Sequence, residues 1–115
     1  PLSRNIALHL TRALALLVVR TLCFLVIGRF SDVLENTLRQ LNSVDFLFVD
    51  GHHEKHATIN YFKMARPFLS EKNIVLFDDI KWSKGMMEAW EEIARSTEAY
   101  DLGPLGICLD VSNKY

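Results

Sequence analysis

The sequence is poor in the residues that build several common kinds of functional site. Its 115 residues include two cysteines and five glycines. Two cysteines, Cys23 and Cys108, cannot form a disulfide framework, and each lies in an apolar run. We therefore expect two buried thiols in a cytoplasmic protein. No G-x-G-x-x-G, P-loop or G-x-S-x-G pattern occurs, so neither a phosphate-cradling loop nor a serine nucleophile is indicated.

An excess of charge of one sign is also absent. The chain has 13 Lys and Arg against 14 Asp and Glu, a formal net charge of −1. This balance argues against nucleic-acid binding driven by bulk charge. With 50% hydrophobic and 23% charged residues, the composition is that of a folded globular chain. The length fits one small domain, residues 1–115.

No uninterrupted apolar run is long enough to cross a membrane. Residues 6–27 are mostly apolar, but His9, Arg12 and Arg20 interrupt them. A spanning helix needs about 20 predominantly apolar residues. No small-residue cleavage site follows this stretch, so we expect neither a membrane span nor a signal peptide.

The order of apolar runs and helical patterns predicts an α/β fold. Short continuous apolar runs, typical of strands buried on both faces, occupy residues 21–27, 44–49 and 73–77. Helical spacing of apolar residues precedes or separates them, over residues 6–17, 31–41 and from about 54 to Pro67, and recurs over 86–93. Two short strands around Gly103-Pro104 predict an antiparallel hairpin at a sheet edge. The pattern indicates a mostly parallel sheet.

Each predicted parallel strand is followed by a polar cluster. In such sheets, ligands bind beyond the carboxyl ends of the strands. The pattern therefore predicts one crevice lined by all three clusters, which are Gly28-Arg29-Phe30, Asp50-Gly51-His52-His53 and Asp78-Asp79.

These clusters have a chemical and a structural interpretation. Converging carboxylates can hold a cationic group, act as general bases or bind a divalent metal. The same aspartates are also favoured in turns and helix caps for local hydrogen bonding alone. A His-Glu-x-x-His zinc site starting at His53 is excluded because Ala57 occupies the second histidine position. His53 or His52 at the rim could instead act as acid, base or hydrogen-bond donor, and Trp82 could cover a ligand.

At this point the residues resemble a family. The run VDFLFVDGHHEKHATINYFKMARPFLSEKNIVLFDDIKWSKGMMEAW is similar to the carboxyl-terminal part of class I S-adenosylmethionine-dependent methyltransferases. It is closest to the small-molecule O-methyltransferase-like branch, whose fourth strand ends in Asp-Gly-x-His and whose fifth ends in Asp-Asp. The segment GRFSDVLENTL and the closing Gly-Ile-Cys-Leu also fit that branch. The resemblance implies a Rossmann-like, mostly parallel sheet with helices on both faces and a C-terminal antiparallel hairpin.

The resemblance also implies roles for individual residues. It implies methyl transfer from S-adenosylmethionine to a small-molecule acceptor, with oxygen as the expected acceptor atom. Asp50 and His53 would be the catalytic residues. The cofactor would be bound by Gly28, Arg29, Phe30, Asp50, Gly51 and His52. A divalent cation such as Mg²⁺ would be held by Asp50, Asp78 and Asp79, although Asp79 replaces the amide that metal-dependent relatives usually carry.

The chain departs from this family at its beginning. The first two strands of the family's sheet would precede Pro1, and no methionine occurs before Met64. Three explanations stay open: upstream residues are missing from this chain, the remaining strands have closed up, or two chains pair their free edges as a homodimer. The alternative function is a catalytically silent Rossmann-like fragment acting in protein association. A dinucleotide-binding domain would lack its glycine fingerprint.

Overall fold

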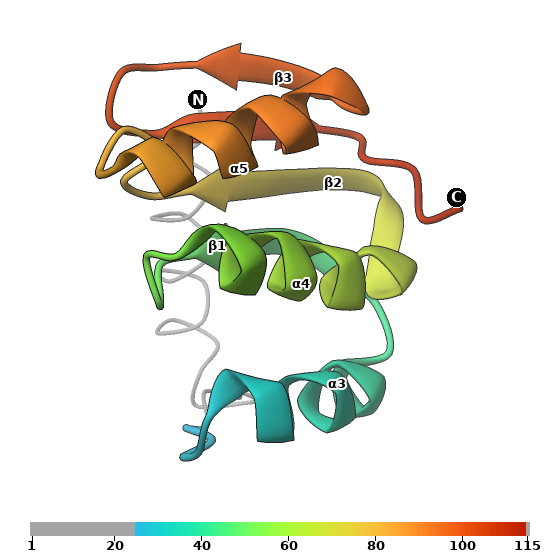
Figure 1. The fold of residues 1–115 in the computed structure, drawn as a ribbon. Coiled ribbons are helices and arrows are strands. Elements are labelled where there is room, and N and C mark those ends of the chain that lie inside the picture. The colour runs from blue at the N-terminus through green and yellow to red at the C-terminus, as the bar shows by residue number, and fades with distance from the viewer. Residues whose placement is uncertain (1–24, 115) are drawn as a thin grey trace, which may run out of the picture.

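A computed structural model describes residues 25–114, and in this part of the chain three α-helices pack on a four-stranded mixed sheet (Figure 1). The elements follow the order that the apolar runs predict. They are α3 (Phe30–Leu41), β1 (Val44–Val49), α4 (Lys55–Ala65), the 3-10 turn η1 (Arg66–Phe68), β2 (Leu69–Phe77), α5 (Lys84–Arg95), β3 (Glu98–Asp101) and β4 (Gly106–Leu109).

Local side chains explain where the helices begin and end. The Glu54 carboxylate accepts the His56 N–H at the start of α4, and the Ser83 hydroxyl accepts the Met86 N–H at the start of α5. Pro67 follows α4 within η1, as expected for a residue that ends a helix. α3 has no side-chain cap at its first turn and begins at Phe30, one residue before the expected start.

The sheet joins a parallel pair to an antiparallel hairpin. The strand order is β1-β2-β4-β3, with β1 and β2 parallel and with β4 antiparallel to both of its neighbours. The predicted C-terminal hairpin at a sheet edge is confirmed. β1 lies at the opposite edge of the described sheet. Because β1 and β2 run in the same direction, Asp50 and Asp78 leave the sheet at the same rim.

The helices described lie together on one face of the sheet (Figure 1). The helix expected over residues 6–17 and most of the strand expected over 21–27 fall outside the described residues, so the second helical face is untested. Residues 25–27 of that run are described and form no strand, and Leu25 is 83% exposed. Of the described helices, none is long and apolar enough to cross a membrane.

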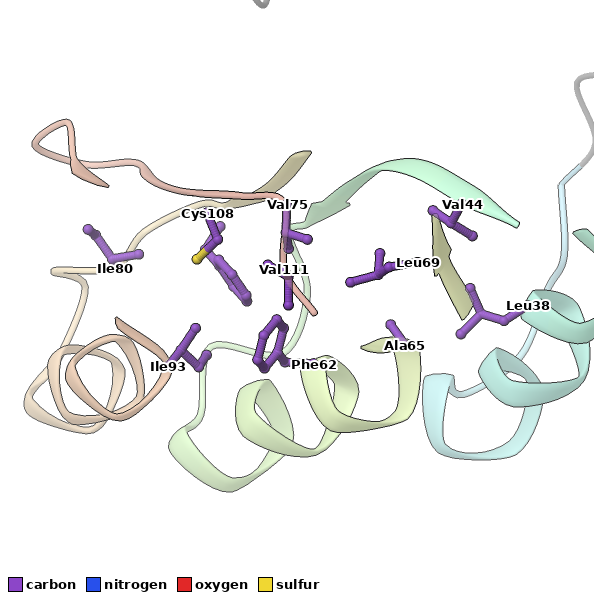
Figure 2. Packing of buried hydrophobic residues seen from close by; sticks show 11 residues of the cluster. Leu38, Val44, Phe62, Ala65, Leu69, Val75, Ile80, Ile93, Cys108 and Val111 are labelled. Atoms are coloured by element: carbon purple, nitrogen blue, oxygen red, sulfur yellow. The ribbon is translucent and has the colours of Figure 1, made fainter. Parts of the chain in front are cut away.

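The core is a single layer between these helices and the sheet. Figure 2 shows Phe62 and Ile93 from the helices directed toward Val75 and Cys108 from the strands. The Phe62 and Phe77 ring centroids are 5.7 Å apart, in an edge-to-face arrangement. Cys108 is fully buried, as predicted, and burial raises the pKa of its thiol, with a smaller opposing effect of the Thr97 hydroxyl. Cys23 lies outside the described residues.

Candidate functional site

The β1–β2 pairing sets the position of the acidic residues. Val49 is the register partner of Phe77, and the Asp78 N–H donates to the Val49 carbonyl oxygen over 3.0 Å. The residue after β1, Asp50, and the two residues after β2, Asp78 and Asp79, therefore leave the sheet at one rim. The order of strands predicted that Asp50, Asp78 and Asp79 meet at this rim; the structure groups Asp50 and Asp79 with His53, and Asp78 is not part of that group.

His53 lies between two of these carboxylates. Its Nε2 is 3.0 Å from Asp79 Oδ2 and 3.7 Å from Asp50 Oδ1. The three side chains are 31% (His53), 34% (Asp79) and 49% (Asp50) exposed, so the cluster lies at the surface but is partly shielded from water. Although the His53 side chain is partly exposed, its Nε2 atom is buried.

The two consecutive aspartates of the β2–α5 loop differ in conformation. Asp79 adopts a left-handed backbone conformation with φ of 54°, a region in which aspartate is more tolerated than most residues. The Asp78 carboxylate accepts the Asp79 N–H over 2.9 Å, and the Asp79 carbonyl accepts the Trp82 N–H over 3.0 Å. This turn brings Asp79 to His53, whereas Asp78 stabilises the turn.

The rest of the β2–α5 loop is held by the β3–β4 hairpin. The Ile80 N–H donates to the Pro104 carbonyl over 3.1 Å, and Lys81 Nζ lies 3.2 Å from Asp101 Oδ2. A hydrogen bond from the Gly103 N–H, and secondarily the ammonium of Lys81, lowers the pKa of Asp101. Because Ile80 and Lys81 directly follow Asp79, these two contacts with the hairpin help to fix the loop that carries Asp79.

Trp82 extends over the cluster. Its ring centroid is 5.5 Å from that of His53 with an interplanar angle of 37°, and the side chain is 67% exposed. A large aromatic side chain left in water beside polar groups offers a surface on which a planar or apolar ligand group can pack. Trp82 therefore lies beside His53, and its expected role of covering a ligand stays a prediction.

An ion pair ties the two helices together below the site. Lys55 Nζ lies 3.1 Å from Glu88 Oε2, which joins the first turn of α4 to α5. The hydrogen bond from Lys55, followed by its charge, lowers the pKa of Glu88. Nothing in the sequence pattern singled out Lys55 or Glu88, because their 33-residue separation hides the contact.

The proposed cofactor-binding residues are brought together only in part. Phe30 lies directly against Gly51, where a Cβ atom would overlap its ring, and Phe30 also contacts Tyr61 edge-on at a centroid distance of 5.2 Å. The start of α3 thus meets the carboxyl end of β1. Arg29 accepts two N–H groups of α3 through its carbonyl. Gly28 has φ of 156° and packs on Val33, which favours glycine there.

His52 differs from its neighbour His53. It is exposed, and its carbonyl oxygen accepts the Glu54 N–H. Sequence reasoning could not choose between these two histidines. The structure distinguishes them, since His53 joins the two aspartates and His52 does not.

The donor atoms of the cluster fit a divalent cation. Asp50, His53 and Asp79 each offer one ligand atom, and these atoms lie within 4.8 Å of one another. Within residues 25–114, no other group of three His, Cys, Asp or Glu side chains brings its possible ligand atoms this close together. The metal ligands expected from the resemblance are Asp50, Asp78 and Asp79. The observed cluster therefore contains two of these three residues, with His53 in place of Asp78.

Comparisons with known proteins agree with this architecture. A family model described as "Methyltransferase domain" matches residues 5–80. The "Uncharacterized protein R132" of Acanthamoeba polyphaga mimivirus is 30% identical over 66 residues, which cover 55% of this chain and 30% of that protein. The chain therefore spans about a third of the length of this relative. No solved structure matches the chain significantly.

The matched family is the one that the order of motifs suggests. Its model covers both the Asp50-Gly51 strand end and the Asp78-Asp79 pair. Since the match extends over more than half of the residues, the chain belongs to the methyltransferase-domain family.

Proposed function

We propose that the protein transfers a methyl group from S-adenosylmethionine to an oxygen atom of a small-molecule acceptor, in the manner of the O-methyltransferase-like branch. One observation carries this proposal above the others: Asp50, His53 and Asp79 converge at the carboxyl ends of adjacent parallel strands. This is the rim at which open α/β sheets bind their ligands.

The residues at the end of β1 fit a cofactor with an aromatic base. Phe30 is 46% exposed and lies on Gly51, so its ring is available as an apolar wall beside the acidic cluster. When bound, S-adenosylmethionine would supply a methyl group on a positively charged sulfur. The carboxylates of Asp50 and Asp79 favour a positive charge in their vicinity.

An acceptor hydroxyl must lose its proton as its oxygen forms the new bond to the methyl carbon. Asp50 has the more exposed of the two carboxylates in the cluster and is therefore the group best placed to take that proton. His53, whose Nε2 lies 3.0 Å from Asp79 Oδ2 and 3.7 Å from Asp50 Oδ1, is the second catalytic group beside the acceptor. Trp82 provides the surface on which the acceptor packs, which aligns its hydroxyl with the methyl group.

The test is isothermal titration of the full-length protein with S-adenosylmethionine and with its demethylated product. We expect saturable heat with both ligands. No heat at high ligand concentration would overturn the proposal.

Substitution of Asp50 separates a catalytic role from a structural one. Asp50→Asn should lower turnover by about 10²-fold or more, the size of effect typical of general-base groups, while the circular dichroism spectrum stays unchanged. Asp45→Asn is the matched control, because Asp45 is an exposed aspartate on the same strand outside the cluster. Equal losses in both variants would contradict the assignment.

A further inference from the structure

A groove separate from the acidic cluster lies between α5, the β2–α5 loop and the end of β3. Its volume of about 520 Å³ is in the range of small-molecule pockets. The apolar part of its lining consists of Ile80 from the loop and of Met87, Trp90 and Ala94 from α5. The cluster of Asp50, His53 and Asp79 does not contribute to this lining, so the groove is a different site from the one that the proposed function uses.

Trp90 gives the groove a rigid apolar wall. Its ring packs closely on Gly106 of β4, and its centroid is 5.9 Å from that of Phe77. The side chain is only half-buried, so part of the ring is left to line the groove. Because these contacts already fix the ring, an apolar or aromatic group can pack on it with little cost in side-chain ordering.

Four charged side chains, two of each sign, complete the lining. Lys81 and Asp101 neutralise each other, since Lys81 Nζ lies 3.2 Å from Asp101 Oδ2. Glu91 and Arg95 are both exposed on α5. Within residues 25–114, neither of these two has an ion-pair partner. The groove therefore offers one anion and one cation to a ligand.

A pair on α3 shows that this arrangement is not set by spacing. Glu35 and Arg39 are the same residue types, also four positions apart, and Arg39 Nη2 lies 2.9 Å from Glu35 Oε1. Residues four apart are neighbours on a helix surface, so Glu91 and Arg95 are close enough to reach one small ligand together. On α5 the two charges line a groove and stay apart, whereas on α3 they bind each other.

We propose that this groove binds a zwitterion with an apolar body, of the class of amino acids that carry a large apolar or aromatic side chain. The ligand's side chain packs on Trp90, its carboxylate binds the Arg95 guanidinium, and its ammonium group binds the Glu91 carboxylate. A ligand with a single charge would satisfy only one of these two residues. The site goes beyond the proposed function, because it requires neither S-adenosylmethionine nor the acidic cluster.

The test measures binding through the fluorescence of Trp90. A Trp82→Phe background leaves Trp90 as the only tryptophan of the chain. The full-length protein is titrated with L-phenylalanine, with excitation at a wavelength that this ligand does not absorb. We expect a saturable change with a dissociation constant of about 1 mM or lower, as befits a ligand of this size. No saturable change would overturn the proposal.

Three related compounds test which groups of the ligand are recognised. Phenethylamine lacks the carboxylate, 3-phenylpropionate lacks the ammonium group, and L-alanine lacks the apolar body. Each should bind about tenfold more weakly than L-phenylalanine, because each loses a charge-assisted hydrogen bond or the burial of apolar surface. Equal affinity of any of the three would show that the missing group is not recognised, and the proposal would be wrong.

Substitutions then assign each charge of the ligand to a residue. Arg95→Gln should weaken L-phenylalanine about tenfold and leave phenethylamine within about twofold, because phenethylamine has no carboxylate to lose. Glu91→Gln should weaken L-phenylalanine and leave 3-phenylpropionate unchanged in the same way. The unaffected compound shows that each variant is folded. Equal losses for both compounds would contradict the assignment.

Two kinds of control separate this groove from other sites. Arg39→Gln and Glu35→Gln change the matched pair on α3 and should leave L-phenylalanine binding unchanged. Asp50→Asn should also leave it unchanged, and a loss there would move the ligand to the acidic cluster and overturn the proposal. Because these titrations contain no S-adenosylmethionine, failure of the groove and failure of the proposed methyl transfer are separately observable.

Discussion

Asn73 is a buried polar residue whose side chain makes three hydrogen bonds. Its side chain is 2% exposed, donates to the carbonyls of Ser70 and Val111 over 2.7 and 2.9 Å, and accepts the Val111 N–H over 3.0 Å. It thereby joins the middle of β2 to the segment after β4. A buried amide with all these partners replaces backbone pairing where the regular ladder ends.

Asn73→Ala should lower the free energy of unfolding by about 1–3 kcal/mol, because it leaves the buried Val111 N–H without an acceptor. Asn73→Asp should cost at least as much, since a carboxylate would face two carbonyl oxygens. Urea unfolding measures both changes. The control Asn36→Ala, on the exposed side of α3, should stay within about 0.5 kcal/mol. An Asn73→Asp variant as stable as the wild type would contradict the role assigned to the two donated hydrogen bonds.

At the scale of elements, β4 and α5 approach each other closely. A Cβ atom on Gly106 would lie 2.6 Å from two ring atoms of Trp90, which itself contacts Phe77 at a centroid distance of 5.9 Å. Gly106→Ala should therefore reduce the free energy of unfolding by about 1–3 kcal/mol through overpacking. The loss should be smaller in a Trp90→Leu background, because that variant lacks the indole ring with which the new Cβ atom overlaps.

Gly85 in α5 is the matched control, because alanine there should leave the free energy of unfolding unchanged or raise it. A Cβ there would meet Lys55 Cβ at 3.6 Å, an ordinary contact, and alanine favours the helix by about 1 kcal/mol over glycine. Chemical unfolding of both variants should show Gly85→Ala unchanged or stabilised. If Gly106→Ala were also neutral, α5 would not be pressed against β4 as described.

The elements also show what the sequence could predict. β1 occupies Val44–Val49 as expected, because its apolar run is bounded by Asn-Ser and Asp-Gly. β2 begins at Leu69, four residues before the predicted start, since the polar residues Ser70, Glu71 and Lys72 interrupt the apolar pattern. Pairing also shifts register between Val44 and Phe46, where the ladder passes from Leu69 to Ile74. Such an irregularity leaves no periodic signal.

For the site, the sequence could predict the rim of the sheet at which the residues gather, but not which of them form the cluster. Strand order is enough to bring Asp50 and the Asp78-Asp79 pair to one rim. Which aspartate enters the cluster depends on the positive φ of Asp79, and which histidine joins it depends on the turn before α4. Both are backbone conformations that several residue types could adopt, so spacing alone could not decide them.

At the scale of the whole molecule, the β1 side of the sheet is unusually apolar. Phe46 and Phe48 are 36% and 48% exposed on one face of β1, opposite the helices, and β1 pairs only with β2 within the described residues. Among residues 25–114, β1 is therefore an edge strand with exposed aromatic side chains, a combination that favours association. This is the observation that favours the alternative function in protein association, and it is independent of the acidic cluster.

We propose that this chain pairs with a second copy through the β1 edge and its two phenylalanines. Sedimentation at increasing concentration should show a shift from monomer to dimer. Phe46→Thr/Phe48→Thr, which keeps a residue suited to a strand, should weaken dimerisation at least tenfold. Tyr100→Thr removes an aromatic ring of similar exposure, 46%, from β3 at the opposite edge and should have no effect. Association that is lost equally in both variants, or absent from the wild type, would argue against the β1 edge. Asp50→Asn should leave the dimer intact, because the acidic cluster lies beyond the carboxyl end of β1 and not on the strand face that carries Phe46 and Phe48.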